Sequence, residues 1–225
     1  MAGPDAEDFL QRMLSNDVTE APCRAMLLTP KARLIAPLVV VRRTDDDFLL
    51  LTEPGLGETV GATLLRARFA AKVEIEPEEH TSVVVFGEDG GIPNEELGEP
   101  GSELLDADVA PTLSADEVER VRIESATPAW GKELDDTILP AEAGLDETHV
   151  SFTKGCYPGQ EPIARLRHRG KVNRTLRLRR RGTTRRSPRL PGFASSGSSY
   201  AGSVRAVFPF APTASSASSG TSTRT

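Results

Sequence analysis

All 33 acidic residues of this 225-residue chain lie in its first 161 positions, and this separation limits which part can fold. Residues 162–225 carry 14 lysines and arginines and no acid, so the net charge of -6 hides two oppositely charged parts. In the last 44 residues, 26 are serine, threonine, glycine or proline, and such a stretch buries too little to offset its ordering entropy. We expect a folded domain over 1–170 and, over 171–225, a remnant that is largely a disordered Ser/Thr/Arg-rich tail.

Apolar periodicity and turn residues predict mixed helices and strands along the folded part. A helix begins near Pro4, and an antiparallel meander of three strands follows over 24–52. Further helices are expected over 56–70, 115–125 and 158–168, and further strands over 72–76, 82–86, 171–179 and 205–208. Residues 87–103 are rich in glycine, glutamate and proline, which favours a loop. These elements predict an α+β fold.

The stretch from Lys154 to Glu161 has the strongest chemical pattern. Two glycines bracket Cys156 in a tight loop, where backbone can approach a ligand closely. Lys154 precedes the cysteine and several arginines follow it, and basic neighbours favour the thiolate form. The alternative is a buried, inert cysteine in a Gly-Pro turn, and spacing alone favours this alternative.

The same stretch resembles the signature of the YgfZ family of folate-binding proteins. The similarity continues through residues 165–171, and residues 9–18 resemble the family's early helix and Asn-Asp-Val turn. Residues 28–33 resemble a family hairpin, with Ala32 in place of the usual glycine. The segment from 122–124 through 140–145 is similar to one shared with the glycine-cleavage T-protein. The resemblance covers about residues 3 to 180.

This resemblance implies a folate-binding domain of the aminomethyltransferase (T-protein) type, with antiparallel sheets and flanking helices. The C-terminal β-barrel of relatives would be truncated or replaced here. The implied ligand is tetrahydrofolate or a related folate, and Cys156 would be the functional thiol. The implied folate-binding residues are Asp17, Trp130, Glu142, Lys154, Tyr157, Gln160 and Glu161.

Three of these positions also have a purely structural interpretation. Asp17 is suited to an Asn-Asp turn, and Glu142 to the first turn of a helix. A single tryptophan such as Trp130 usually packs in a core. The resemblance, not the residue types, favours the folate-binding interpretation.

The family resemblance implies a protein that supports iron–sulfur cluster assembly or repair in client enzymes, without a strong catalytic cycle of its own. Two alternatives stay open: a folate-dependent aminomethyltransferase of the glycine cleavage system, and a non-functional gene fragment. The expected partners are a folate and iron–sulfur client enzymes, and a monomer is expected.

Several other classes fit poorly. Two cysteines without a Cys-x-x-Cys pair cannot supply the four thiolates that usually hold a cluster, and the three histidines lack zinc-ligand spacing. No apolar run approaches the about 20 residues of a membrane span, and no signal segment is apparent, so a cytoplasmic protein is expected. The basic tail lacks interleaved aromatic residues, which argues against a nucleic-acid-binding arm.

The two ends depart from the family pattern. Relatives reach the opening Gly-Pro-Asp only after a leading segment, so a first strand is expected to be missing. A frameshift after about Arg179 would explain the acid-free tail. A basic nucleic-acid-binding arm is the functional alternative.

Overall fold

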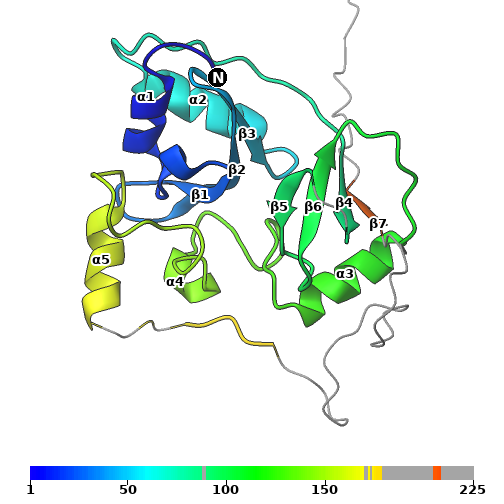
Figure 1. The fold of residues 1–225 in the computed structure, drawn as a ribbon. Coiled ribbons are helices and arrows are strands. Elements are labelled where there is room, and N and C mark those ends of the chain that lie inside the picture. The colour runs from blue at the N-terminus through cyan, green and yellow to red at the C-terminus, as the bar shows by residue number, and fades with distance from the viewer. Residues whose placement is uncertain (88–89, 170–171, 173, 179–204, 209–225) are drawn as a thin grey trace, which may run out of the picture.

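Two antiparallel β-sheets with flanking helices form the part of the chain that the computed structural model describes, residues 1–87, 90–169, 172, 174–178 and 205–208. The first sheet has the order β1-β2-β3, and the second has the order β5-β6-β4-β7. Figure 1 shows the two sheets side by side, each with helices of its own. This arrangement confirms the predicted α+β fold with antiparallel sheets.

The first sheet is the predicted meander. It consists of β1 (Cys23–Leu28), β2 (Leu34–Thr44) and β3 (Asp47–Thr52), joined by tight turns. Helices α1 (Ala6–Met13) and α2 (Gly57–Ala67) cover one of its faces, and the short helix η1 (Val18–Glu20) leads into β1. The core between them contains Phe9, Leu10, Leu27, Val40, Phe48 and Leu64.

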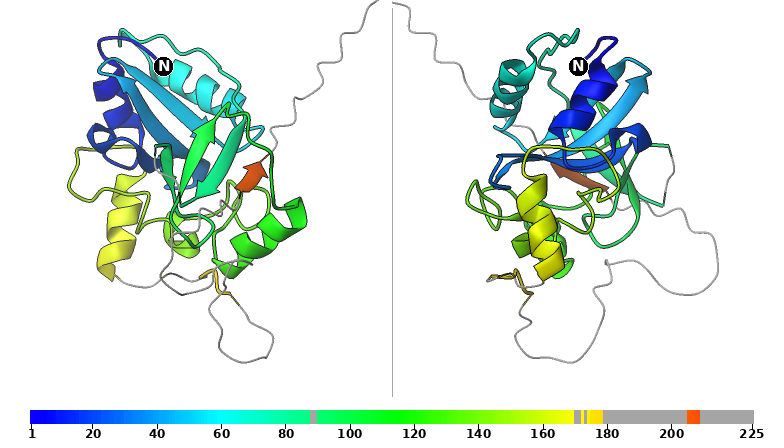
Figure 2. Two further views of the ribbon diagram at one scale, coloured as in Figure 1. Left: turned by 45° about the vertical axis from the view of Figure 1, so that its right-hand side comes forward. Right: turned by 90° about the vertical axis from the view of Figure 1, so that its left-hand side faces the viewer.

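The other face of the first sheet is covered by residues from much later in the sequence. Met26 and Leu28 of β1 pack against a cluster that includes Leu145, Tyr157 and Ile163. Helices α4 (Pro140–Ala143) and α5 (Gln160–Arg169) lie on this side, away from α2, in both views of Figure 2. Strand β1 is therefore buried on both faces.

The second sheet is built from β4 (Ser82–Phe86), β5 (Ile92–Asn94), β6 (Gly101–Leu105) and β7 (Arg205–Phe208). Helix α3 (Ala115–Glu124) packs Val118 and Val121 against Val84 and Phe86. Its capping box is complete: the Ser114 hydroxyl accepts from the Glu117 backbone N–H, and the Glu117 carboxylate accepts from the Ser114 N–H.

Three sequence predictions need correction. Residues 87–103 are not only a loop, because β5 and the start of β6 lie within them and pair with each other. Residues 72–76 form no strand; Glu74 makes only an isolated bridge to Ala2. The described residues between 172 and 178 are not in a strand either. The glycines and prolines of 87–103 hid two short strands, β5 and the start of β6, which pair with each other, while β6 also pairs with β4.

The predicted strand at 205–208 is confirmed as β7, which pairs antiparallel with β4. Of the remaining residues in the predicted tail over 171–225, the structure describes 172 and 174–178, and the others lie outside the described residues. The predicted helix at 158–168 is confirmed as α5, shifted by one or two residues at its ends.

Candidate functional site

A cavity of about 240 Å³, here called the polar cavity, lies between the two sheets. Its apolar wall comes from the first sheet, with Pro37 and Val39 of β2 and Leu51 of β3. Polar side chains from several other segments complete the lining: Arg24, Thr52, Glu53, His80, Ser82, Asn94, Glu96, Glu103 and His149.

Two charged groups in the polar cavity lack a full set of partners. The Arg24 guanidinium donates through Nη1 to Glu96, but its Nη2 is buried and has no hydrogen-bond partner within the described part of the chain. The Glu53 carboxylate also accepts no hydrogen bond from the described residues. Unmatched donors and acceptors in one cavity are what a polar ligand can satisfy.

The other polar groups of the cavity are held by hydrogen bonds to one another or to neighbouring residues of the protein. Asn94 is 3% exposed, and its Nδ2 donates to Glu103 at 3.1 Å while its Oδ1 accepts from the Glu96 backbone N–H at 3.0 Å. The backbone carbonyl of His149 accepts a hydrogen bond from the Ser15 hydroxyl, and Nδ1 of the His149 ring lies 2.7 Å from Thr148 Oγ1. These bonds fix the cavity walls before any ligand arrives.

Burial changes the charge of two lining residues. Burial, followed by the negative charge of Glu96, raises the pKa of Glu53 above its usual range. Burial also lowers the pKa of His149 to about 4, and the positive charge of Arg24 adds to this effect. His149 is therefore neutral at neutral pH, and Glu53 ionises less readily than an exposed glutamate.

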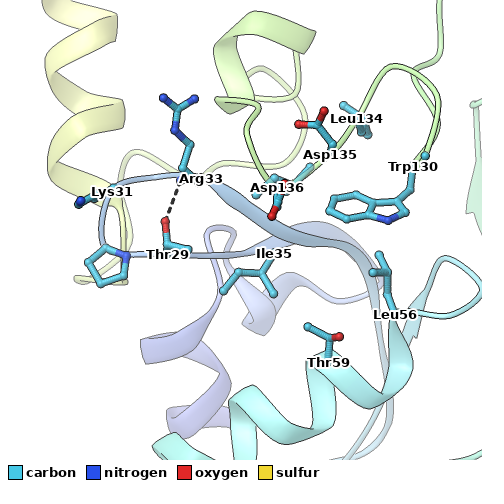
Figure 3. A pocket seen from close by; sticks show the side chains of 13 residues that line it. Thr29, Lys31, Arg33, Ile35, Leu56, Thr59, Trp130, Leu134, Asp135 and Asp136 are labelled. Atoms are coloured by element: carbon cyan, nitrogen blue, oxygen red, sulfur yellow. Dashed lines mark hydrogen bonds between the residues drawn. The ribbon is translucent and has the colours of Figure 1, made fainter.

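A second, larger opening of about 780 Å³, here called the aromatic cleft, lies beside the start of β2 (Figure 3). Trp130, Ile35, Leu56 and Leu134 give it apolar walls. Its polar lining comes from Thr29, Lys31, Arg33, Thr59, Asp135 and Asp136. Among the seven residues predicted from the resemblance to bind folate, Trp130 is the one that lines this cleft, and none of them lines the polar cavity.

Lys154 reaches back across the fold to the end of α1. Its Nζ donates to the carbonyl oxygens of Leu14, at 2.9 Å, and Asn16, at 2.6 Å, and lies 5.7 Å from the Tyr157 ring centre. Burial lowers the pKa of Lys154 to about 8, while the charge of Asp17 opposes this shift. Lys154 therefore fastens the Lys154–Glu161 loop to the segment before β1.

Asp17 caps the short helix η1. Its carboxylate accepts from the Thr19 hydroxyl at 2.6 Å, from the Thr19 N–H and from Gln11 Nε2. The Thr19 hydroxyl bond is the main reason that the pKa of Asp17 is lowered. Cys23 lies close enough to Asp17 and Lys154 to feel both charges, and burial raises its pKa to about 11.

The other predicted residues of the Lys154–Glu161 loop differ in exposure. Cys156 is exposed, so its sulfur is not in a dry interior. Tyr157 is buried, and its hydroxyl has no partner among the described residues. Gln160 and Glu161 begin α5, where Glu161 forms an exposed ion pair with Arg165 at 2.9 Å. Arg167 stacks over Phe152, 3.7 Å from its ring centre.

Glu142 is buried in α4 and holds a distant segment. Its carboxylate accepts from Arg174 Nε at 3.0 Å and from the Leu139 N–H at 2.9 Å, and its carbonyl accepts from the Leu176 N–H. Burial alone would raise the pKa of Glu142, but the hydrogen bonds from Arg174 and Leu139 lower it overall. Both interactions are internal to the protein.

The structure therefore brings Asp17, Lys154 and Tyr157 together, and places Trp130 and Glu142 elsewhere. Sequence reasoning missed the polar cavity, whose charged residues Arg24, Glu53 and Glu96 stand far apart in the chain. The sequence held only a weak signal for this cavity. Arg24 lies in a strand that is otherwise apolar, and Glu53 directly follows the end of another strand.

The described residues contain no group of three or more His, Cys, Asp and Glu side chains arranged to hold a metal ion. None of the helices in the described part of the chain is long and apolar enough to cross a membrane. What the polar cavity offers to a ligand is hydrogen-bonding groups, charged groups and an apolar wall.

Three comparisons with known proteins bear on this arrangement. The chain is 30% identical over 187 residues to an uncharacterized protein of Haemophilus influenzae, which covers 77% of this chain and 67% of that protein. It is 29% identical over 234 residues to the tRNA-modifying protein YgfZ of Edwardsiella ictaluri, covering 84% of this chain and 69% of that protein. No protein-family model matches the chain.

The fold is similar to that of the glycine cleavage system aminomethyltransferase T from Bartonella henselae, with a TM-score of 0.62 at 17% sequence identity. The match covers 75% of this chain but 60% of that enzyme, so the chain spans less than two thirds of the enzyme's length. The sequence relatives and the shared fold agree with the motif at 154–161. The chain belongs to the YgfZ family, which is related to the aminomethyltransferases.

Proposed function

We propose that this protein binds a reduced folate, such as tetrahydrofolate, with the pterin ring in the polar cavity. The observation that carries the proposal is that one cavity with an apolar wall is lined both by Arg24, whose buried Nη2 has no hydrogen-bond partner among the described residues, and by the carboxylate of Glu53. A pterin is a flat polar bicycle whose amino-pyrimidine edge donates two parallel hydrogen bonds and whose ring oxygen accepts one. Glu53 supplies the acceptor for that edge, and Arg24 the donor for the oxygen.

The size of the polar cavity supports the same assignment. Whole drug-sized ligands occupy sites of about 300–1,000 Å³. A cavity of about 240 Å³ suits the bicyclic ring alone, with the rest of the folate outside it. Pro37, Val39 and Leu51 provide a flat apolar surface for the ring.

Isothermal titration calorimetry with tetrahydrofolate tests the proposal. Glu53→Gln keeps the side-chain shape but removes the charge, and we expect it to weaken binding at least about tenfold, as for other hydrogen bonds to charged groups. Glu58→Gln is the matched control, because Glu58 is an exposed acid of α2 that lines neither cavity. Equal affinities for the wild type and both variants would contradict the assignment.

We further propose that the folate-bound protein supports iron–sulfur cluster assembly or repair in cytoplasmic client enzymes. Because one relative is named a tRNA-modifying protein, we include enzymes that act on tRNA among these clients. The exposed Cys156 would be the group that meets a client. In a strain lacking the homologue, the wild-type chain should restore client activity and Cys156→Ala should not; full rescue by the variant would rule out this role.

The second candidate function is that of an aminomethyltransferase. The fold similarity to the aminomethyltransferase T of Bartonella henselae is the observation that favours it. This function predicts folate-dependent turnover of a lipoyl-carrier substrate by the purified protein. Turnover that depends on tetrahydrofolate and on Glu53 would favour the enzyme over the support role.

A further inference from the structure

Phe69 directly follows helix α2 and stands where helices most often end with a glycine. Arg68 before it still has a helical backbone, with a φ of −61°, whereas Phe69 has a φ of +42° in the left-handed region. A side chain disfavours this conformation, which glycine adopts without a steric cost. Strained residues of this kind gather at sites where the strain serves binding or catalysis.

Packing of the Phe69 ring does not offset this strain. Phe69 is 94% exposed, and Leu65, one turn earlier on α2, is 49% exposed. A phenylalanine stabilises a fold when it is buried, and a ring in water contributes nothing of that kind. A strained turn that holds an aromatic ring in solvent is suited to contact with a partner.

Three cations lie within three residues of Phe69 in the chain. Arg66, Arg68 and Lys72 are all exposed, and none of them forms an ion pair with a described residue, although acids far outnumber lysines and arginines in the first 161 positions. Arg68 Nη1 donates to the Val73 carbonyl at 3.3 Å, and its other N–H groups point to no described acid. The Asp5 carboxylate accepts from the Lys72 backbone N–H at 2.8 Å and leaves the ammonium group free of it.

The exposed side chains at this end of α2 are here called the cationic turn: Leu65, Arg66, Arg68, Phe69 and Lys72. None of them lines the polar cavity or the aromatic cleft. Thr59, at the other end of α2, lines the cleft, and ten residues of helix correspond to about 15 Å. Helix α2 also lies on the side of the first sheet away from α4 and α5 (Figure 2). The cationic turn is therefore separate from the site proposed for folate.

The chemistry of the cationic turn selects an anion that carries flat rings. A single-stranded nucleic acid combines both, because its bases stack on aromatic side chains and its phosphates bind lysine and arginine. One ring and three cations suit a few nucleotides, whereas a stable protein partner buries about 800 Å² on each side. An anionic bilayer would present its negative charge to a whole face of a protein whose net charge is -6, while a flexible strand contacts the turn alone.

We propose that the cationic turn binds a single-stranded nucleic acid. One base stacks on the open face of Phe69, and the phosphates on either side of it contact Arg66, Arg68 and Lys72. The left-handed backbone holds the ring in solvent before the strand arrives. This inference is independent of the proposed folate function.

Fluorescence anisotropy of a short dye-labelled oligouridine, and of the matching oligothymidine, measures binding to the full chain. Phe69→Ala should weaken binding about tenfold, within the range for stacking of one base. For three phosphate contacts, the logarithm of the affinity should fall with the logarithm of the salt concentration with a slope of about −2, and Arg66→Ala should reduce this slope by about 0.7. Binding of both strands, or of RNA alone through its 2′-hydroxyl groups, supports the site.

The 14 lysines and arginines of residues 162–225 also attract polyanions, so the contact has to be located in the chain. Photo-crosslinking of a thiouridine-containing strand, mapped by mass spectrometry, should label the peptide that contains Phe69. Phe152→Ala and Arg120→Ala are the matched controls, an exposed ring and an exposed cation outside the cationic turn, and both should bind as the wild type does. No crosslink at Phe69, or equal weakening by the controls, would overturn the proposal.

Phe69→Gly separates loss of the site from loss of the fold. Glycine relieves the backbone strain, so this variant should have a higher urea midpoint than the wild type and yet bind the strands as weakly as Phe69→Ala does. Sedimentation with phosphatidylserine vesicles tests the other anionic surface. Vesicle binding that depends on Phe69, without a crosslink from the thiouridine strand, would replace the nucleic acid by a membrane surface.

Discussion

Gly159 lies so close to Ala32 that no side chain fits between them: an added Cβ would lie 3.0 Å from the Ala32 Cα and 2.8 Å from the Thr29 carbonyl oxygen. The backbone of Gly159 also has a φ of +86°, which disfavours any residue with a side chain. This contact packs the start of α5 onto the hairpin before β2. The loop that carries Cys156 and the part of the aromatic cleft that Lys31 and Arg33 line are therefore fixed to each other.

Gly159→Ala should lower the free energy of unfolding by about 3 kcal/mol, because backbone strain and a clash with backbone atoms add. Urea denaturation measures the change. Gly155→Ala is the control from the same loop: a Cβ there meets nothing within 4 Å, so a change within about 0.5 kcal/mol is expected. Similar losses in both variants would show that the contact with Ala32 is not the cause.

Glu53→Gln should stabilise the free protein even as it weakens folate binding. The raised pKa of Glu53 means that the folded state holds this proton more tightly than the unfolded chain. The associated stability is full below the usual glutamate pKa and is lost as the pH rises through the folded-state value. At pH 7 the glutamine variant should therefore be more stable by about 1 kcal/mol, and thermal unfolding should show the gain shrinking near pH 4. A gain that is independent of pH would exclude this cause.

His80 should make stability fall as the solution becomes alkaline. Its Nδ1 lies 2.6 Å from Asp106 and its Nε2 lies 3.2 Å from Glu78, and the Asp106 hydrogen bond is the main reason that its pKa is raised. A raised histidine pKa stabilises the fold below the unfolded value of 6.5, and this contribution is lost as the pH rises through the folded-state pKa.

His80→Gln should remove this pH dependence and cost at most about 1 kcal/mol at pH 6, since its partners are largely exposed. Denaturation midpoints between pH 5 and about pH 9 test it. His168→Gln, at an exposed position of α5, serves as the comparison and should leave the slope of the wild type unchanged.

The two cysteines should differ in reactivity toward a thiol reagent. Cys156 is exposed, whereas Cys23 is partly buried and has a pKa of about 11. When the reaction is followed by absorbance, one thiol of the native protein should react fast and the other slowly. In denaturant both thiols should react fast. Cys156→Ser should remove the fast phase; if Cys23→Ser removes it instead, the loop at 154–161 is not arranged as described.

Lys154→Met should destabilise the fold by about 2 kcal/mol, because the methionine keeps an apolar stem but leaves the Leu14 and Asn16 carbonyls without the ammonium donor. Lys72→Met, at an exposed lysine, should change the urea midpoint little. No difference between the two variants would mean that the bonds to the carbonyls contribute nothing net.

Local pattern predicted the elements whose signals are contained in a few residues. The meander of the first sheet, the Ser114 capping box and the start of α5 at the Pro-Gly turn all follow from nearby residue types. Strands β5 and β6 were missed because their short segments pair only with each other and with β4, and glycine and proline dominated their composition.

The candidate site was harder to predict because its residues meet only through tertiary packing. Arg165 and Arg167, two of the arginines that follow Cys156 in the sequence, instead contact Glu161 and Phe152 respectively. Arg24, Glu53 and Glu96 gain their properties from burial between two sheets, and no local pattern records that burial. The family resemblance identified the kind of protein, and the arrangement of the two openings came from the fold.

Strand β1, buried on both faces, sets an order for synthesis of the chain. Its helical cover is complete once α2 has been made, but the side that holds Met26 and Leu28 stays open until Ile163 has left the ribosome. During that interval the nascent sheet exposes apolar surface, a state prone to association with other chains. Fragments that stop before α5 should consequently need chaperone help to remain in solution.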